Sequence, residues 1–233
     1  MTQRTAPSSK AQGFTLVEVL VAIGVMAVLA LMSWQGIDGM LRTQTALQQR
    51  ADQIRTLQAG LAQWQTDLNR LATPAGISSW DWDGKVLRLT REAIQASEGL
   101  QVVAWTWRQQ GAGGEWLRWQ SPALTTRSAW QDAWQNARTW SQVPTESLRG
   151  AEVRVHPLLG WQLFVHRGGS WTNPLSSDAI TPAATGTSSP ALGTAATRIP
   201  DGVRLVLDLP PDTPVAGRLS MDWVRPTLSG GTP

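Results

Sequence analysis

The amino-acid sequence predicts an α+β protein in which a long N-terminal helix packs on an antiparallel β-sheet. Three observations carry this prediction. An apolar run lies near the N-terminus, a helical stripe of apolar residues follows it, and short β-rich segments separated by turns fill the rest. Of the 233 residues, 42% are hydrophobic, which is enough to bury a core.

The apolar run covers residues 14–34, FTLVEVLVAIGVMAVLALMSW, in which Glu18 is the one charged residue. As a helix, these 21 residues reach about 30 Å, the thickness of a membrane hydrocarbon core. The run is longer than the apolar region of a cleaved secretory signal, which has about 7–15 residues. Because Arg4 and Lys10 precede it, we expect a single-pass protein whose N-terminus is cytoplasmic and whose remainder crosses the membrane.

Glu18 is the anomaly in this run. A carboxylate inside an apolar span costs roughly 2.5–3.5 kcal/mol, so it is expected to have a partner. The segment GFTLVEVLVA, Gly13 to Ala22, resembles the N-terminal segment of type IV pilins and type II secretion pseudopilins. The resemblance implies that residues 1–13 are a prepilin leader peptide, that prepilin peptidase cleaves between Gly13 and Phe14, and that the new amine of Phe14 is methylated. It also implies that Glu18 pairs with the N-terminal amine of a neighbouring subunit, which offsets the desolvation of both charges and fixes the subunit register.

Residues 35–72 are predicted to continue the helix in amphipathic form. Apolar residues recur at steps of 4, 3, 3, 4, 3, 4 and 3. They are Leu47, Ala51, Ile54, Leu57, Leu61, Trp64, Leu68 and Leu71. Gly36 and Gly39 are expected to bend or locally unwind the helix, and Pro74 and Gly76 place its end near Ala72. The stripe fits a coiled-coil dimer or packing on the chain's own sheet, and the β-rich region that follows favours the sheet.

Residues 73–226 are predicted to form a β-rich head. The expected strands are 85–90, 100–108, 115–120, 152–156, 161–166, 202–209 and 218–224. The turn-like segments 109–114 and 157–160 each predict a hairpin. Residues 172–199 are expected to be a flexible loop and residues 227–233 a disordered tail.

The sequence predicts no enzyme, no metal site and no cofactor. It contains no Cys, no G-x-S-x-G elbow and no P-loop. Asp81, Asp83 and Gly84 fail the register of a calcium loop and are expected to form a turn before the strand at residue 85. His156 and His166 are expected on adjacent strands of one hairpin, as ordinary strand residues without a third ligand.

The sequence contains 14 Trp, twelve of them in the predicted head. Trp105 and Trp107 have the spacing of one strand face, which fits a core or an aromatic surface for a sugar or single-stranded nucleic acid. Trp130, Trp134 and Trp140 are predicted to lie on or just beyond a short helix over residues 128–139, as core residues or as a candidate interface between subunits.

Nucleic acid is not expected as a partner. The net charge of +3 comes from 20 basic and 17 acidic residues, and loss of Arg4 and Lys10 with the leader reduces it to +1 (18 minus 17).

Further segments resemble one branch of this family, the J-type minor pseudopilins of the type II secretion system. They are LQAGLAQWQTDLNRL, GEWLRWQ and the terminal IPDGVRLVLDL with GRLSMDW. The resemblance implies a pilin-like fold and a structural role at the pseudopilus tip, on the inner membrane with a periplasmic head. The implied partners are I-, K- and H-type minor pseudopilins, the major pseudopilin, prepilin peptidase, the inner-membrane assembly platform and exoprotein cargo. The alternative is a type IV pilus minor pilin whose head binds DNA, a glycan or a surface.

Overall fold

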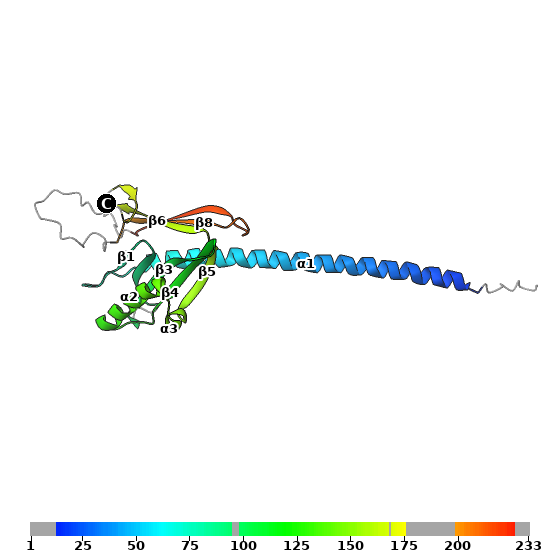
Figure 1. Cartoon of the computed structure of the whole chain (residues 1–233), viewed down its shortest axis with the longest axis horizontal. Helices are drawn as coiled ribbons and strands as arrows, with labels where there is room; N and C mark the ends of the chain where they lie inside the picture. The colour runs from blue at the N-terminus through cyan, green and yellow to red at the C-terminus, as the bar shows by residue number, and fades with distance from the viewer. Residues whose placement is uncertain (1–12, 95–97, 168, 176–198, 227–233) are drawn as a thin grey trace, which may run out of the picture. The chain divides into compact units, whose positions relative to one another are not determined.

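The computed structural model describes residues 13–94, 98–167, 169–175 and 199–226 (Figure 1). The chain divides into two compact units, residues 1–49 and residues 50–233. One helix, α1 (Leu16–Asn69), begins in the first unit and ends in the second. The predicted segments 14–34 and 35–72 are therefore parts of one helix, which stays helical through Gly36 and Gly39. The local unwinding expected at these glycines does not occur.

The end of α1 lies earlier than predicted. The helix stops at Asn69, and the next residues join the edge of a sheet. Leu71 forms an isolated antiparallel bridge with Arg91, and the backbone N–H of Ala72 donates to the carbonyl of Thr90 at 3.0 Å. The last turn expected from the apolar spacing is therefore extended chain.

In the second unit, the strands within the described residues form two antiparallel sheets in place of the single sheet expected. Sheet A has the order β1-β2-β3-β4-β5, and sheet B has the order β7-β6-β8-β9. The bounds in sheet A are β1 Trp80–Trp82, β2 Val86–Glu92, β3 Leu100–Gln110, β4 Gly113–Gln120 and β5 Glu152–Leu158. Those in sheet B are β6 Gly160–Arg167, β7 Ser170–Thr172, β8 Gly202–Leu209 and β9 Gly217–Val224.

The first predicted hairpin is present, and the second is not. β3 and β4 pair from Val103 with Gln120 to Gln110 with Gly113. β5 and β6, in contrast, belong to different sheets, because β6 pairs with β8 along seven residues. The chain crosses between the sheets at Leu159, whose N–H donates to the carbonyl of Asp208 at 2.8 Å. Leu163 and Val165 of β6 thereby join the core cluster that also contains the buried stripe of α1 and residues of sheet A.

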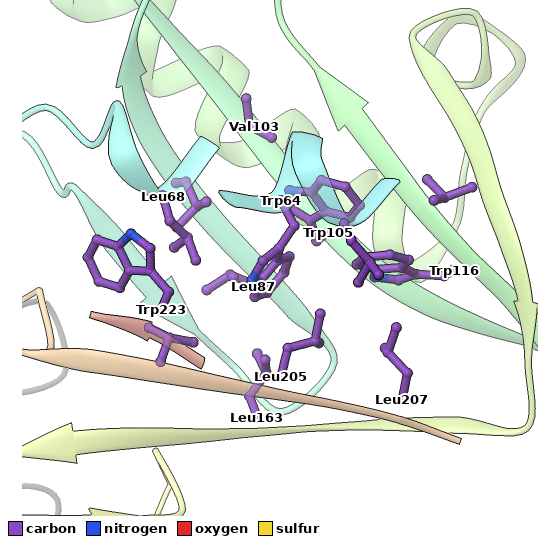
Figure 2. Close-up of a cluster of buried hydrophobic side chains, with 14 of the residues drawn as sticks. Trp64, Leu68, Leu87, Val103, Trp105, Trp116, Leu163, Leu205, Leu207 and Trp223 are labelled. Carbon is purple, nitrogen blue, oxygen red and sulfur yellow. The ribbon is translucent and has the colours of Figure 1, made fainter. Parts of the chain in front are cut away.

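The main core contains the buried stripe of the C-terminal part of α1 together with residues of both sheets (Figure 2). Trp64 is fully buried, and its ring lies 5.4 Å from that of Trp105 in sheet A and 6.3 Å from that of Trp161 in sheet B, measured between centroids. Of the predicted stripe, Leu57, Leu61, Trp64 and Leu68 are buried, whereas Leu47 is 62% exposed. This part of α1 therefore packs on sheets of its own chain, which is the alternative that the β-rich sequence after the helix predicted.

A second core lies on the other face of sheet A, under α2 (Arg127–Gln142). This helix starts at Thr126, whose hydroxyl accepts the N–H of Ala129 at 3.3 Å. Its buried residues are Trp130, Ala133, Trp134, Ala137 and Trp140, on a spacing of three and four. A single turn, α3 (Glu146–Arg149), connects it to β5.

At Gly60, α1 lies close to Val155 of β5. A Cβ added there would overlap Cγ1 of Val155. We expect Gly60→Ala to lower the free energy of unfolding by about 1–3 kcal/mol through overpacking, although alanine is the better helix former. Chemical denaturation of the full chain in detergent, followed by Trp fluorescence, measures this. Gly39→Ala is the control, because nothing lies within 4 Å of a Cβ at that position; equal stabilisation by both variants would contradict the close approach.

Candidate functional site

The residues at the predicted cleavage site lie just before α1. Gly13 and Phe14 precede the helix, and the Phe14 side chain is 81% exposed. Thr15 caps the helix, because its hydroxyl accepts the backbone N–H of Glu18 at 3.3 Å and its carbonyl accepts the N–H of Val19 at 3.3 Å. The Gly13–Phe14 bond therefore lies in exposed, non-helical chain, the conformation in which a protease can reach a peptide bond.

Glu18 lies in the first turn of α1, three residues after Thr15. A carboxylate at this position is favoured by the helix dipole and by the free N–H groups of the first turn. Its helical neighbours three and four residues away include Phe14, Val21 and Ala22. Among the described residues, Glu18 has no ion-pair partner, and its side chain is exposed. The position thus leaves the carboxylate available to a cation from outside the chain.

The apolar part of α1 has no cover from its own chain within the described residues. The large apolar side chains from Phe14 to Met32 are exposed by between 47% and 81%, on every side of the helix. By length and composition α1 is able to cross a membrane. A helix that is apolar all round needs lipid or other helices around it.

Comparison with known families agrees with this geometry. Residues 8–34 match the family described as the prokaryotic N-terminal methylation motif. No curated protein matches the chain significantly. The matched segment contains Gly13, Phe14 and Glu18 and ends at Trp34. The chain therefore carries the N-terminal signal of type IV pilins and pseudopilins, followed by an apolar helix and a pilin-like α+β head, as expected for a protein anchored by a single membrane span.

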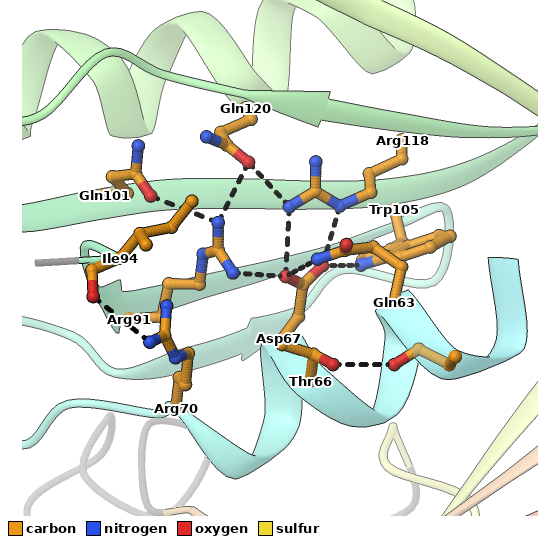
Figure 3. Close-up of polar contacts among 11 residues, drawn as sticks. Gln63, Thr66, Asp67, Arg70, Arg91, Ile94, Gln101, Trp105, Arg118 and Gln120 are labelled. Carbon is orange, nitrogen blue, oxygen red and sulfur yellow. Dashed lines mark hydrogen bonds and ion pairs between the residues drawn. The ribbon is translucent and has the colours of Figure 1, made fainter. Parts of the chain in front are cut away.

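The head contains a buried ionic cluster that the sequence did not predict (Figure 3). Asp67 on α1 is completely buried against three neighbouring strands of sheet A. Arg91 of β2 lies 2.9 Å from its Oδ1, and Arg118 of β4 donates to both oxygens, at 2.8 and 3.0 Å. The indole N–H of Trp105 of β3 donates to Oδ2 at 2.9 Å, and Gln63 one helical turn earlier donates to Oδ1 at 2.8 Å.

The cluster holds two cations and one anion in the core. Two further glutamine oxygens accept from the arginines. Gln120 accepts from both Arg91 and Arg118, at 3.0 and 2.7 Å, and Gln101 accepts from Arg91 at 3.1 Å. Burial lowers the pKa of Arg91, and Asp67 opposes this effect. One carboxylate thus pairs with guanidinium groups from two strands, and the neutral glutamine oxygens satisfy further N–H groups of the two arginines, so the cluster joins α1 to the sheet with a net charge of +1.

The sequence contains a signal for Asp67, which lies three residues after Trp64 and one before Leu68 on the buried side of the helix. A charged residue on an amphipathic helix is usually solvated, so the sequence pattern alone does not indicate that Asp67 is buried.

The three tryptophans predicted as a candidate subunit interface are covered by their own chain. Trp130 and Trp134 are each 8% exposed, and Trp140 is fully buried. Two of their indole N–H groups are hydrogen-bonded within the chain, since Trp130 donates to Thr90 at 2.9 Å and Trp140 to Glu152 at 2.7 Å. They form the core between α2 and sheet A, so the interface interpretation has no exposed tryptophan surface on which to rest.

The remaining sequence predictions for the head have different outcomes. Asp83 accepts the N–H groups of Lys85 and Val86, both at 2.9 Å, and so forms the predicted turn. Trp105 and Trp107 lie on one face of β3, toward the main core. His156 and His166 lie on β5 and β6, in different sheets, so their expected placement on one hairpin was wrong. Most of the predicted loop, residues 176–198, and the tail 227–233 lie outside the described residues.

His156 makes the stability of the head depend on pH. Its side chain is buried, its Nε2 has no hydrogen-bond partner among the described residues, and burial lowers its pKa below the ordinary 6.5. As the pH falls below about 6.5, the unfolded chain takes up a proton at this residue before the folded chain does. The unfolded state is therefore favoured progressively in acid.

We expect the Tm of the full chain in detergent to fall between about pH 7.5 and 5.5, and to fall less in His156→Gln. His166 stays in both proteins and serves as the internal reference. Equal changes in Tm for the two proteins would contradict the role of His156.

Proposed function

We propose that this protein is a minor pseudopilin of the type II secretion system, of the J type, and a structural component of the pseudopilus tip that supports export of folded proteins. The observation that carries the proposal is the continuity of α1. The methylation motif at residues 8–34 opens a helix whose apolar half is exposed and whose other half is the centre of the head core. Further support comes from the J-type resemblance of the segments around Trp64, Trp116 and Trp223.

In this proposal, the first turn of α1 supplies the assembly chemistry. Prepilin peptidase releases residues 1–13 and methylates the new amine at Phe14. The helix lies in the inner membrane, with its N-terminus cytoplasmic and the head periplasmic, until the assembly platform inserts it between neighbouring helices. There Glu18 pairs with the amine of the adjacent subunit, and the apolar side chains of α1 exchange lipid for other helices.

The proposed protein has no turnover of its own. Its role is structural. Its neighbours in the assembly are I-, K- and H-type minor pseudopilins and the major pseudopilin, and the cargo of the assembly is exoproteins. ATP hydrolysis by another component drives the assembly.

A deletion strain distinguishes this function from that of a type IV pilus minor pilin. We expect loss of exoproteins from the medium while surface pili remain, and recovery of secretion on expression of the full chain. Loss of pili with normal secretion would instead establish the pilus alternative.

Glu18→Leu tests the assembly step. We expect this variant to insert and to be processed, but its recovery with neighbouring pseudopilins after cross-linking in membranes to fall by more than about tenfold, because the neighbouring amine loses its counter-ion. Asp52→Leu is the matched control, since Asp52 is an exposed carboxylate on the same helix, 70% accessible. Normal recovery of Glu18→Leu would show that the amine pairing is wrong.

A further inference from the structure

A cavity of about 310 Å³ lies in the head, between the first turn of α2 and the start of β3. Its apolar walls come from four side chains of separate segments, Ile77, Leu100, Leu124 and Trp130. Trp130 belongs to the second core, and Ile77 and Leu124 pack against that core. The volume is at the lower end of the range of ligand sites in proteins, so the cavity is large enough for one bulky apolar group.

The walls of the cavity are fixed by hydrogen bonds within the chain. Leu100 and Leu124 form an isolated antiparallel bridge, in which the N–H of each donates to the carbonyl of the other, at 3.0 and 2.7 Å. Gly99 permits this close approach, because its φ angle is positive and a Cβ there would overlap the carbonyl oxygen of Leu124. The indole N–H of Trp130 donates to the hydroxyl of Thr90 at 2.9 Å. The cavity is therefore preformed, which lowers the entropy cost of binding.

The polar part of the cavity lining is positively charged. Arg127, the first residue of α2, lines the cavity and is exposed, and it forms no ion pair with the described residues. Its guanidinium donates to the carbonyl of Gly76 at 2.9 Å. The first turn of α2 contains no acidic residue, although the helix dipole favours an anion at this end. No acidic residue lines the cavity in the described part of the chain, so the charge of Arg127 and the dipole add.

We propose that this cavity binds the C-terminal residue of a partner protein, with a large apolar side chain against Leu100, Leu124 and Trp130. The terminal carboxylate pairs with Arg127, whose guanidinium keeps N–H groups for it beside the bond to Gly76. A C-terminal residue carries an apolar side chain and an anion on the same Cα, which matches a cavity whose apolar walls and cation lie together. The proposal rests on the head alone and holds for a secretion pseudopilus and for a type IV pilus.

Three peptides test the proposal on the full chain in detergent. We expect acetyl-Gly-Ser-Gly-Ser-Phe with a free carboxylate to bind with a Kd below about 1 mM, measured by saturation-transfer difference NMR with empty micelles as the blank. The same peptide with a C-terminal amide is expected to bind roughly tenfold more weakly, because it has no anion for Arg127. A peptide that ends in Gly with a free carboxylate is expected not to bind. Equal binding of the carboxylate and amide peptides, or no binding of either, overturns the proposal.

Two variants show whether the peptide occupies this cavity. Arg127→Gln is expected to reduce the tenfold preference for the carboxylate to less than about threefold, whereas Arg138→Gln, an exposed position on the same helix, keeps it. Thr125→Glu places a competing carboxylate in the cavity lining and is expected to weaken binding roughly tenfold. Thr139→Glu is its control, because Thr139 is exposed on α2 outside the cavity. Thermal melting checks that the variants are folded. Unchanged binding in both Arg127→Gln and Thr125→Glu would place the peptide elsewhere and overturn the proposal.

Discussion

Asp67→Asn is expected to lower the free energy of unfolding of the head by about 3–5 kcal/mol, because it leaves two buried guanidinium groups without their counter-ion. Arg91 and Arg118 both bond to the carboxylate, and neither has water to replace it, since the two side chains are 4% and 10% exposed. A domain of this size has a total stability of about 5–15 kcal/mol, so the loss is a large share of it.

Urea denaturation of the full chain in detergent, followed by Trp fluorescence, measures this change. The indole of Trp105 bonds to Asp67 and reports the cluster directly. Asp52→Asn is the matched control, because Asp52 lies on the same helix and pairs with Arg55 at 3.0 Å in an exposed position. Its replacement is expected to cost less than about 1 kcal/mol. Equal effects of the two changes would mean that the buried cluster does not hold α1 on the sheet.

Gly13→Ala is expected to leave the leader attached, so that the full-length precursor accumulates in the membrane. The structure offers no folding reason for such a defect, because a Cβ at Gly13 meets nothing within 4 Å. Failure of cleavage would therefore come from recognition by the peptidase. Without cleavage Phe14 has no free amine, and the pairing partner proposed for Glu18 does not form.

Gel mobility and the mass of the purified protein distinguish precursor from processed chain. Gly24→Ala is the control, since this glycine lies within α1 and a Cβ there also meets nothing within 4 Å. We expect Gly24→Ala to be processed normally. Normal processing of Gly13→Ala would show that prepilin peptidase does not recognise Gly13 as the cleavage site.

The helix and most strands could be predicted because they depend on local patterns. The apolar stripe around Trp64 and the alternating residues of β3 and β8 repeat with the period of their element. The placement of β6 in a second sheet could not be predicted, because Pro157 to Gly160 resembles a tight turn in sequence. β6 instead pairs with β8, and Leu163 and Val165 enter the core that also contains Trp64, which is a property of the assembled chain.

For the functional residues too, the sequence predicts what a local pattern contains and misses contacts between distant segments. Gly13, Phe14 and Glu18 form a contiguous motif, and sequence alone is enough to identify them. The cluster around Asp67 joins α1 to residues 24 to 51 positions further along, and no local pattern contains it. The tryptophans of α2 had the spacing of a buried face, and the sequence did not say whether a sheet or a second subunit buries them.

We propose above all that this chain is processed at Gly13, as type IV pilin-like proteins are. The most direct test is the intact mass, with N-terminal sequencing, of the full-length protein purified from membranes of its natural host. We predict a mature chain that begins with N-methylated Phe14 and lacks residues 1–13. A protein that keeps residues 1–13, or that is cleaved after the apolar run near Trp34, would contradict it.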